Sequence, residues 1–589
     1  MTDVAPRADL TLQQGRQLPI DPNRHTAPEA RFTEAEGDIP DEIPVLIVGG
    51  GPVGLVTSML LSRHGIRSLL VERHSGTAIQ PKARYINART MEIFRGLGIE
   101  QNIHNVAIPH TRNVIWARSL ADEEILRLPV ETMIPETARD WSPTWGCTST
   151  QEIFEPVLLA QARLLAQAQI HFNTELLSFE QREDCVIARL LHRQNGRISE
   201  VRAQYLIGAD GAHSRVREGL GIRMQGQPVL SHFINIHFRA DLARWVGDRE
   251  INVCFVTDPR AVGLLMPDGE DRWRFTAFCS PDKGQHPEDY TAERSVEVVR
   301  MAVGVPDLPV QLRGIFPWSD AALLAERFYE GRVFLVGDAE HLVSPAGGFG
   351  MNIGIQSAHN LTWKLAAVLK GWAAPALLAS YEAERAPISR QAAEYLGGGG
   401  LSSRQANRDT LASSPSEVAP RPLPGRSDFF RGHGLVFGAT YESSSITPDG
   451  AAPVQVANPV TEYIQNARPG SRAPHVWLQG HEHDSTGIST IDLFGRDPVL
   501  LTGAGGQAWC ATAYQIARVL GVPVRTYRVA PDGDLSDVDN AWADAYGVQS
   551  DGAVLVRPDG YVAWRRRTTD QVDLQTELEQ AIKRALGYE

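Results

Sequence analysis

The stretch IPVLIVGGGPVGLVTSMLLSRHGIRSLLVE, residues 43–72, carries two short apolar runs with a glycine turn and a helical run between them. The first apolar run is typical of a buried strand, and the helical run ends at Gly65. The second apolar run is again strand-like. The stretch therefore predicts a βαβ unit that begins the folded part of the chain.

The turn in this unit has the spacing of a nucleotide-binding loop. Gly49, Gly51 and Gly54 form GxGxxG between the strand and the helix, and Glu72 ends the next strand. Glycines let the backbone approach a pyrophosphate, the helix N-terminus supplies N–H donors, and an acid can bind a ribose diol. A purely structural glycine turn is the alternative. The motif predicts a dinucleotide without separating NAD from FAD.

The bulk composition favours small-molecule chemistry in a multidomain protein. The chain has 589 residues, 43% hydrophobic and 22% charged, with a formal net charge of −13, which argues against a nucleic-acid partner. No apolar run approaches the roughly 20 residues of a membrane helix, and the first 42 residues lack a secretory apolar core. Five scattered cysteines without a CxxC fit reduced thiols. We expect a cytoplasmic protein with no membrane partner and no bound metal.

Three regions beyond the βαβ unit differ in pattern. Residues 226–316 contain strand-like runs separated by Asp, Pro and Gly turns, which predict an inserted antiparallel-type sheet. Residues 397–426 hold GGGG and a Pro/Ser-rich run, which predict a linker or surface excursion. From about residue 469 an αβ unit begins, with a hairpin turning at Asp559-Gly560 and a closing helix.

Two further motifs place an acid after a buried strand. YLIGADGAHSRVR, residues 205–217, ends its strand at Asp210-Gly211, and GRVFLVGDAEHLVSPAGGFGMN, residues 331–352, ends its strand near Asp338 and continues into a glycine loop and a helix. With GxGxxG and Glu72, these motifs resemble the FAD-dependent aromatic hydroxylases of the para-hydroxybenzoate hydroxylase superfamily. YESSSI, residues 441–446, and the closing αβ unit resemble the branch of phenol hydroxylase and 2,4-dichlorophenol 6-monooxygenase.

The resemblance implies a fold of α/β and α+β class. It consists of a Rossmann-like FAD-binding domain with an inserted mixed or antiparallel-sheet substrate domain, plus a C-terminal thioredoxin-like α/β domain. The expected segments are a flexible extension (1–42), the FAD-binding domain in three parts (43–115, 151–225 and 317–396), the substrate domain in two parts (116–150 and 226–316), a linker and excursion (397–468), and the thioredoxin-like domain (469–589). Cys510 has no second cysteine nearby, so a dithiol redox role for the last domain is excluded.

The resemblance also implies which residues hold FAD. Asp338 would bind the ribityl chain, and the backbone of the following loop would approach the isoalloxazine ring, where N–H groups can stabilise negative charge on reduced flavin. That loop contributes Pro345, Gly347, Gly348, Gly350, Met351 and Asn352. A glycine-rich helix cap is the alternative.

Other cofactor contacts implied by the resemblance have weaker local signals. Asp210 and Gly211 match a motif associated with flavin and nicotinamide binding, although a structural turn would explain them too. Gln151 matches a glutamine that contacts flavin, but it could be a surface residue. Arg73 is a further cofactor-binding candidate. Lys82 stands where relatives usually have an arginine for cofactor phosphates.

The sequence departs from its relatives at three other positions. Relatives read GDAAH and GIQDA where this chain has Glu340 and Ser357, and we expect flavin binding to survive both changes. Arg84 occupies a position that is often histidine. A phenol has a pKa of about 10, so a nearby cation would favour the phenolate. We hypothesise that Arg84 contacts substrate, with a phosphate contact or a surface ion pair as alternatives.

His237 is a second candidate for the substrate pocket. Side chains alternate along a strand, so Asn235 and His237 share one face and Ile236 and Phe238 the other. The polar face could point at substrate or at water.

The resemblance implies a single-component monooxygenase that uses FAD, with NADPH or NADH as co-substrate, O2 and a small phenolic or polyketide-type aromatic substrate. In such enzymes oxygen adds at the flavin C4a carbon, and the hydroperoxide hydroxylates the ring. One alternative is Baeyer–Villiger oxidation or epoxidation of a polycyclic polyketide. Another is a non-catalytic FAD-binding redox sensor or interaction module, which Glu340 and Ser357 keep open. A homodimer is left open as well.

Overall fold

The computed structural model describes residues 38–588, with gaps at 81, 110, 134–137, 270, 282–283, 396–431, 481–486 and 571–572. The described chain forms two compact units. The first contains residues 113–127 and 231–320, and the second contains residues 38–112, 128–230 and 321–588. The expected flexible extension falls almost wholly, and the expected linker at 397–426 wholly, outside the described residues.

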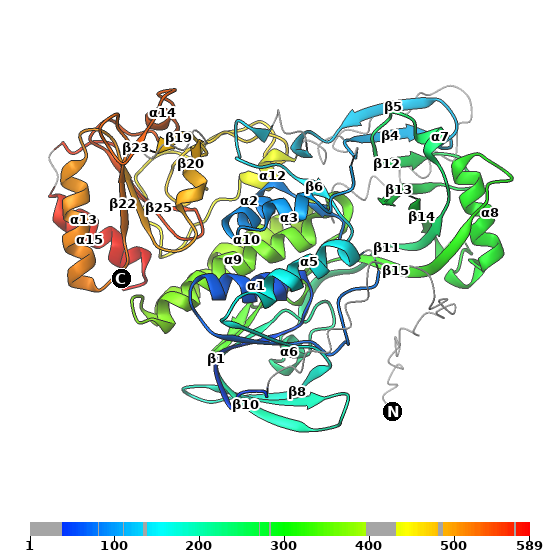
Figure 1. Ribbon diagram of the computed structural model, residues 1–589, viewed down its shortest axis with the longest axis horizontal. Coiled ribbons are helices and arrows are strands. Elements are labelled where there is room, and N and C mark those ends of the chain that lie inside the picture. The colour runs from blue at the N-terminus through cyan, green and yellow to red at the C-terminus, as the bar shows by residue number, and fades with distance from the viewer. Residues whose placement is uncertain are drawn as a thin grey trace, which may run out of the picture. The chain divides into compact units, whose positions relative to one another are not determined.

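The second unit is built on a sheet whose central strands are parallel. Its order is β16-β17-β10-β1-β2-β7, and a β8–β9 hairpin extends it through β10 (Figure 1). The strands are β1 (Glu42–Val48), β2 (Ser68–Val71), β7 (Ala168–His171), β8 (Thr174–Gln181), β9 (Val186–His192), β10 (Ile198–Gly208), β16 (Tyr329–Glu330) and β17 (Val333–Leu335). β1 pairs in parallel with β10 and β2, and β2 is fully buried. Such continuous apolar strands are expected where helices cover a parallel sheet.

The helices of this unit pack next to the sheet. They are α1 (Pro52–Arg63), α2 (Ala88–Gly96), α3 (Glu100–His104), α5 (Gln151–Arg163), α6 (Arg215–Gly219), α9 (Phe349–Leu369) and α10 (Ser380–Glu394), with the two-residue strands β3 (Tyr85–Ile86) and β6 (Cys147–Thr148) pairing antiparallel. The 21-residue helix α9 is buried over most of its length and packs on α1. The sequence predicted the first β1-α1-β2 segment, and the fold confirms it.

The first unit is dominated by one large, mostly antiparallel sheet with order β18-β15-β11-β14-β13-β12-β4-β5. Its elements are β4 (Asn113–Ala117), β5 (Glu124–Pro129), β11 (Met224–Arg239), α7 (Ala243–Val246), β12 (Ile251–Val256), β13 (Gly263–Gly269), β14 (Arg272–Cys279), α8 (Ala292–Val303), β15 (Gln311–Ala325) and β18 (His341–Leu342); β5, β11 and β15 continue into the second unit, to which β18 belongs. Ile234, Ile236 and Phe238 are buried, whereas Asn235 and His237 are only half-buried. This alternation places the two polar residues on the face opposite to the core.

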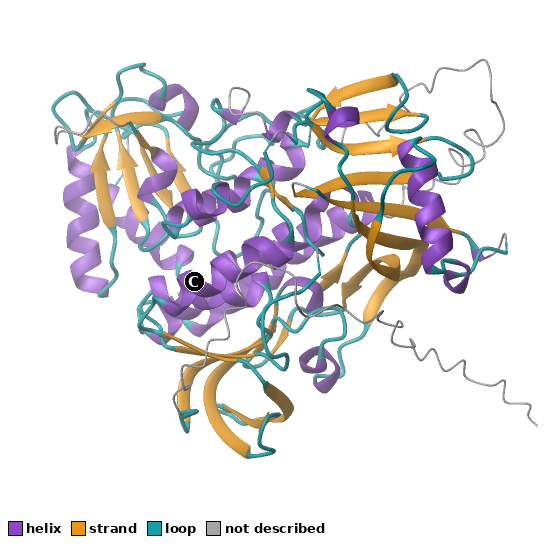
Figure 2. Ribbon diagram, turned by 45° about the vertical axis from the view of Figure 1, so that its right-hand side comes forward, coloured by secondary structure: helices purple, strands orange, loops and turns teal. Residues whose placement is uncertain are grey.

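The C-terminal part of the second unit is a thioredoxin-like α/β domain. A four-stranded sheet of order β22-β21-β24-β25 is covered by α13 and α15, which lie side by side (Figures 1 and 2). The elements are α12 (His433–Phe437), β19 (Trp477–Gly480), β20 (Ile488–Ser489), β21 (Val499–Thr502), α13 (Gln507–Leu520), β22 (Arg525–Arg528), β23 (Leu535–Ser536), α14 (Trp542–Tyr546), β24 (Ala553–Val556), β25 (Val562–Arg566) and α15 (Leu574–Ala585). Gly560 has the left-handed φ of 79° that the β24–β25 turn needs.

Among the described residues, no helix combines the length and apolar character that crossing a membrane would require.

Candidate active site

The first glycine loop is packed so tightly that two of its glycines leave no room for a side chain. Gly49 has a φ of 112°, and a Cβ there would lie 2.3 Å from the Ala209 carbonyl oxygen. A Cβ on Gly54 would lie 2.0 Å from the Gly49 oxygen. Gly51, the N-cap of α1, meets no such obstacle, so its surroundings are open. The loop thus presents bare backbone at the start of α1, as a bound pyrophosphate requires.

Glu72 shapes this loop as well as facing it. One carboxylate oxygen accepts a hydrogen bond of 2.7 Å from the Gly50 N–H, and the other accepts one of 2.8 Å from the His74 N–H. The His74 ring nitrogen Nδ1 also lies 2.5 Å from the second oxygen. A carboxylate has about four acceptor positions, so one remains for a ribose hydroxyl. Arg73 beside it is exposed, and its carbonyl accepts a hydrogen bond from Arg193.

Asp210 caps a helix with both carboxylate oxygens. One accepts a hydrogen bond of 2.5 Å from the Ser214 hydroxyl, and the other accepts one of 3.1 Å from the Val216 N–H at the start of α6. Burial raises the pKa of this carboxyl. Gly211 follows with a left-handed φ of 81°. Asp210 therefore has the structural role in a turn that was the alternative to cofactor binding. Its contact with a cofactor stays a prediction.

The second glycine loop bends sharply before α9. Gly347 and Gly348 both have positive φ, at 78° and 69°, and a Cβ on Gly348 would lie 2.8 Å from the Tyr85 Cβ. The Asp338 side chain is exposed, and its Oδ1 atom lies 3.9 Å from where a Cβ on Gly350 would stand. The carboxylate therefore lies beside the N-terminus of α9. Pro345 is exposed and Met351 half-buried.

The buried side chain of Asn352 fastens this loop to β3. Its Oδ1 accepts a hydrogen bond of 2.9 Å from the Asn87 N–H, and its Nδ2 donates to the carbonyls of Tyr85, at 2.9 Å, and Gly348, at 2.6 Å. Half-buried Arg84 directly precedes Tyr85. The amide thus holds the Arg84 segment against the glycine loop. Sequence reasoning assigned only the backbone of Asn352, because its partners Asn87 and Tyr85 are far away in the sequence and leave no local pattern.

Gln151, the first residue of α5, supports the same segment from another side. Its Oε1 accepts a hydrogen bond of 3.2 Å from the Ala83 N–H, and its Nε2 donates to Glu155 at 2.6 Å. Glu155 in turn accepts one of 2.7 Å from the Ala78 N–H, and burial raises its pKa. Lys82 is exposed on this segment. Gln151 is buried, so the alternative that it is a surface residue is wrong.

Glu340 and Ser357, the two departures on the flavin loop and its helix, contact one another. The Ser357 hydroxyl donates to Glu340 Oε1 at 2.7 Å, and the Tyr381 hydroxyl lies 2.6 Å from Oε2. Arg385 donates to the Ser357 oxygen at 3.1 Å. All four side chains are essentially solvent-free. The carboxylate therefore sits inside a satisfied buried network, which explains how the chain accommodates it.

His341 completes this network. Its Nε2 lies 3.2 Å from the Gly350 carbonyl, which can only accept, and its Nδ1 lies 3.1 Å from Glu340. Both ring nitrogens therefore lie next to acceptors, an arrangement that favours the protonated ring. Although burial opposes this charge, Glu340 and then Asp338 raise the pKa of His341. The ring lies buried against the Gly350 carbonyl of the glycine loop.

Comparison with protein families identifies two regions of the chain. Residues 42–395 match the FAD binding domain, and residues 466–588 match the C-terminal domain of aromatic-ring hydroxylases. The chain belongs to the FAD-dependent aromatic-ring hydroxylases. This confirms the resemblance inferred from the sequence.

Individual relatives cover almost the whole hydroxylase. It is 42% identical to a protein of Streptomyces halstedii assigned as a polyketide hydroxylase, over 90% of this chain and 94% of that protein. It is 35% identical to 2,4-dichlorophenol 6-monooxygenase of Cupriavidus pinatubonensis, over 93% and 96%. Among solved structures, the flavin-dependent monooxygenase PieE in complex with FAD and substrate aligns with a TM-score of 0.83 at 33% identity, covering 94% of this chain and all of that one.

The residues of the hydroxylase fit both ends of FAD, the pyrophosphate end and the flavin end. The Gly49 and Gly54 positions have no space for a Cβ, so the loop that would hold the pyrophosphate is bare backbone. The exposed Asp338 carboxylate leaves an acceptor for the ribityl chain, and the left-handed Gly347 and Gly348 bring backbone without side chains to where the ring would lie. FAD binding is thus a property of the family and of this chain's own geometry.

The first unit contributes a polar sheet face. His237 is half-buried on β11, opposite Arg274 of β14, and packs edge-on against Phe316 with ring centroids 5.0 Å apart. Its Nε2 atom is buried and has no hydrogen-bond partner within the described part of the chain. Burial, and then Arg274, lower the pKa of His237 to about 4. A neutral imidazole with an unused nitrogen is suited to bind a hydroxyl or carbonyl of a ligand.

Proposed function

We propose that this hydroxylase acts on a phenol ring of an aromatic polyketide and that Arg84 and His237 contact that substrate. The observation that carries the substrate class is the 42% identity to the protein assigned as a polyketide hydroxylase, against 35% to the dichlorophenol monooxygenase. Both matches span nine-tenths or more of each chain, so the difference is not due to coverage. The enzyme uses FAD with NAD(P)H as the electron donor.

Bound FAD supplies the activation of oxygen, and the chain supplies placement and charge. We assign Asp338 to the ribityl hydroxyls and the backbone from Gly347 to Asn352 to the flavin ring. N–H groups at the start of α9 favour negative charge there, and the raised pKa of His341, whose ring contacts the Gly350 carbonyl, favours it further. Electron-rich reduced flavin is stabilised by both features.

Arg84 is proposed to bind the phenolic oxygen. Its segment is held to the glycine loop through Asn352, which is the support for the assignment. A guanidinium near a phenol lowers the pKa of the hydroxyl and increases electron density in the ring. That density favours attack on an electrophilic oxygen at the ortho or para carbon. His237, being neutral near pH 7, is proposed to form one hydrogen bond with a hydroxyl or carbonyl of the substrate.

The experiment that tests this function is product analysis with purified holoenzyme. A panel of aromatic polyketides and simple phenols is screened for substrate-stimulated flavin bleaching by NADPH and NADH, and products are characterised by mass and by position of the added oxygen. We expect an added hydroxyl on a polyketide ring. A ring ester or lactone would overturn hydroxylation. Faster bleaching with dichlorophenol than with every polyketide would overturn the substrate class.

We further propose that O2 is the oxygen donor and that the enzyme works in the cytoplasm as a homodimer. The five cysteines are unpaired, which fits a reducing compartment. On α13 the large apolar side chains of Tyr514 and Val519 are 64% and 82% exposed, which favours a partner on that helix. Sedimentation analysis of wild type and Val519→Glu tests the dimer, which is discarded if both are monomers.

A further inference from the structure

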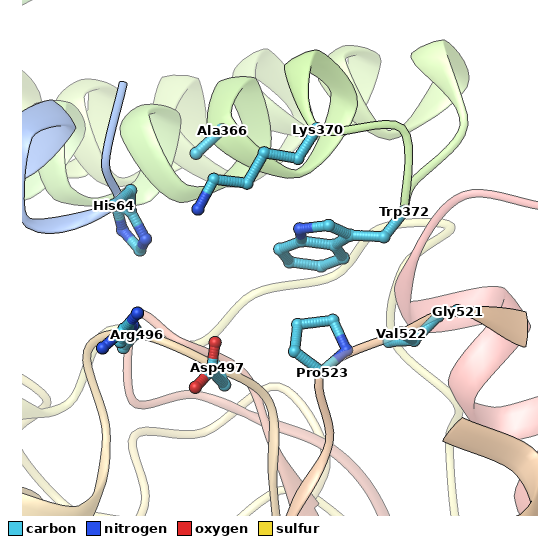
Figure 3. A pocket seen from close by; sticks show the side chains of 9 residues that line it. All are labelled: His64, Ala366, Lys370, Trp372, Arg496, Asp497, Gly521, Val522 and Pro523. Atoms are coloured by element: carbon cyan, nitrogen blue, oxygen red, sulfur yellow. The ribbon is translucent and has the colours of Figure 1, made fainter. Parts of the chain in front are cut away.

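A cavity of about 410 Å³ lies where the FAD-binding part of the second unit meets the thioredoxin-like domain. Figure 3 shows His64, Lys370 and Trp372 on one wall and Arg496, Asp497 and Pro523 on the other. His64 caps α1, Lys370 caps α9, and the facing residues precede β21 and β22. Its volume is in the range of sites that hold small organic ligands, and it exceeds what one phosphate fills.

The cavity carries uncompensated positive charge. Within the described residues, neither the Lys370 ammonium nor the Arg496 guanidinium has a hydrogen bond or an ion pair. Asp497 is already committed to Arg525, at 2.9 Å. Arg63, which donates to the Gly495 carbonyl at 3.1 Å, adds another cation. Lys370 and Arg496 are exposed, so water and salt screen their charges. Their attraction for an anion becomes strong only when a bound ligand displaces the water around them.

His64 distinguishes this cavity from an ordinary basic surface. Its side chain is only 4% exposed, lines the cavity and has no hydrogen-bond partner in the described part of the chain. Figure 3 shows the ring between Lys370 and Arg496. Burial, with Lys370 as the next cause, lowers the pKa of His64 to about 3, so the ring is neutral and can donate one hydrogen bond. Because its ring lines the cavity, a ligand there can form a hydrogen bond with it.

The opposite end of the cavity is suited to a flat ring. The Trp372 indole and the Pro523 ring face one another across the gap (Figure 3). An aromatic face and a proline ring offer apolar surface on both sides of a planar heterocycle. The half-buried Asp497 carboxylate between the two ends can accept a hydrogen bond from a hydroxyl. Cations at one end, an acceptor in the middle and a stacking slot at the other end match a nucleotide.

We infer that this cavity binds a nucleotide, with its phosphates on His64, Lys370 and Arg496 and its base between Trp372 and Pro523. The site is separate from the flavin ring loop, because the 21 residues of α9 place about 30 Å of helix between Gly348 and Lys370. A ligand here does not exchange hydride with the flavin directly. It joins the two domains at the far end of the helix whose N-terminus carries the flavin loop.

The test is calorimetric titration of FAD-saturated enzyme with ADP, adenosine and inorganic phosphate at constant ionic strength. Saturating FAD keeps ADP out of the flavin site. ADP is expected to bind one site per chain, more tightly than either fragment. Lys370→Gln and Arg496→Gln should each weaken ADP binding by about tenfold, the value of one charge-assisted hydrogen bond. Arg518→Gln, an exposed arginine of the same domain, is the control and should bind as wild type.

Each other outcome overturns part or all of the inference. No ADP binding, or equal binding by wild type and Lys370→Gln, removes the site. Phosphate that binds as tightly as ADP removes the base slot. The dependence of flavin-reduction rate on NAD(P)H concentration should be the same in wild type and both variants; if it shifts in parallel with ADP affinity, the cavity belongs to the nicotinamide site. None of these results alters the hydroxylation proposal.

Discussion

The Ser357 hydroxyl on α9 donates a 2.7 Å hydrogen bond to the buried carboxylate of Glu340. The family pattern that this sequence resembles has alanine at the Glu340 position and an acid at the Ser357 position. Compared with that pattern, the carboxylate stands on the other side of this contact. The Arg385 guanidinium donates to Ser357 at 3.1 Å. It therefore has a carboxylate nearby whether the acid stands at position 340 or at position 357. We read the two departures as one exchange. They give no support to a loss of catalytic function.

This reading predicts the behaviour of single and double variants. Glu340→Ala removes the carboxylate that contacts Tyr381 and His341 and interacts electrostatically with Arg385. We expect a loss of about 3–5 kcal/mol in the free energy of unfolding. Adding Ser357→Asp restores the arrangement of the relatives and should recover at least half of that loss. Thermal unfolding and FAD content are the measurements. If the double variant is no more stable than Glu340→Ala, the exchange is refuted.

A pH dependence follows from the His341 imidazolium. Its pKa is raised in the folded state, so its stabilising contribution is complete below about pH 6.5 and is lost as pH rises through the folded pKa. Between these values the free energy of unfolding should fall by at most about 1.4 kcal/mol per pH unit for this one proton. Denaturant titrations of wild type and Glu340→Gln from pH 6 to 9 are compared. The difference between them should shrink as pH rises, and a constant difference would contradict the charged ring.

Asp338→Ala should yield folded protein with little bound flavin. Losing a charge-assisted hydrogen bond to the ribityl chain weakens FAD binding by about ten- to a hundredfold. Asp338→Asn, which keeps one acceptor, should fall between wild type and the alanine variant. Flavin fluorescence titration of apoprotein measures the affinity. A variant that retains full yellow flavin content excludes the ribityl role.

Arg84→Ala should impair the substrate-dependent step and leave FAD affinity unchanged. The expected result is a weaker stimulation of flavin reduction by substrate, together with a rise in the pH at which hydroxylation is fastest, because the phenol is no longer activated by the guanidinium. Arg84→Lys keeps the charge and should be intermediate. Stopped-flow absorbance with a fixed substrate supplies both values. Unchanged substrate affinity in the alanine variant would take Arg84 out of the pocket.

A buried ion cluster fixes the thioredoxin-like domain to α10. Arg557 donates to both oxygens of Glu384, at 2.6 and 2.8 Å, and Lys364 donates to the same carboxylate at 2.7 Å. Arg557→Ala leaves this carboxylate with one buried cation fewer and should cost about 3–5 kcal/mol of unfolding free energy. Glu297→Ala, which breaks the exposed pair with Arg294, should change stability by less than about 1 kcal/mol. Similar losses for the two variants would show that the cluster does not join the domains.

The sequence predicted those parts that depend on local patterns. The β1-α1-β2 segment, the strands of the inserted sheet and the hairpin at Gly560 follow from short-range periodicity and turn residues. Distinguishing FAD from NAD needed the resemblance carried by two motifs far downstream of the first, at residues 205–217 and 331–352. The alternation around His237 was visible because one face of β11 is apolar.

The missed features depend on side chains that meet only after packing. Glu340 could not be explained from the chain, because its donors come from α9 and α10 rather than from its neighbours. The Asn352 contact joins two loops, and the Arg557 cluster joins two domains. Asp210 shows that a sequence motif associated with cofactors can also have a structural role, because its carboxylate caps the helix that follows it.

The long helix α9 connects the flavin loop to the last domain. Its first turn is tied to β3 by Asn352, its middle holds Ser357 and Lys364 in buried networks, and Lys370 ends it beside the thioredoxin-like domain. Removing that domain would expose the charges of Lys364 and Glu384 to water and free the C-terminal end of the helix whose N-terminus carries the flavin loop. Chimeras between relatives should therefore exchange α9, α10 and the last domain together, because a junction between them would separate charges from their partners.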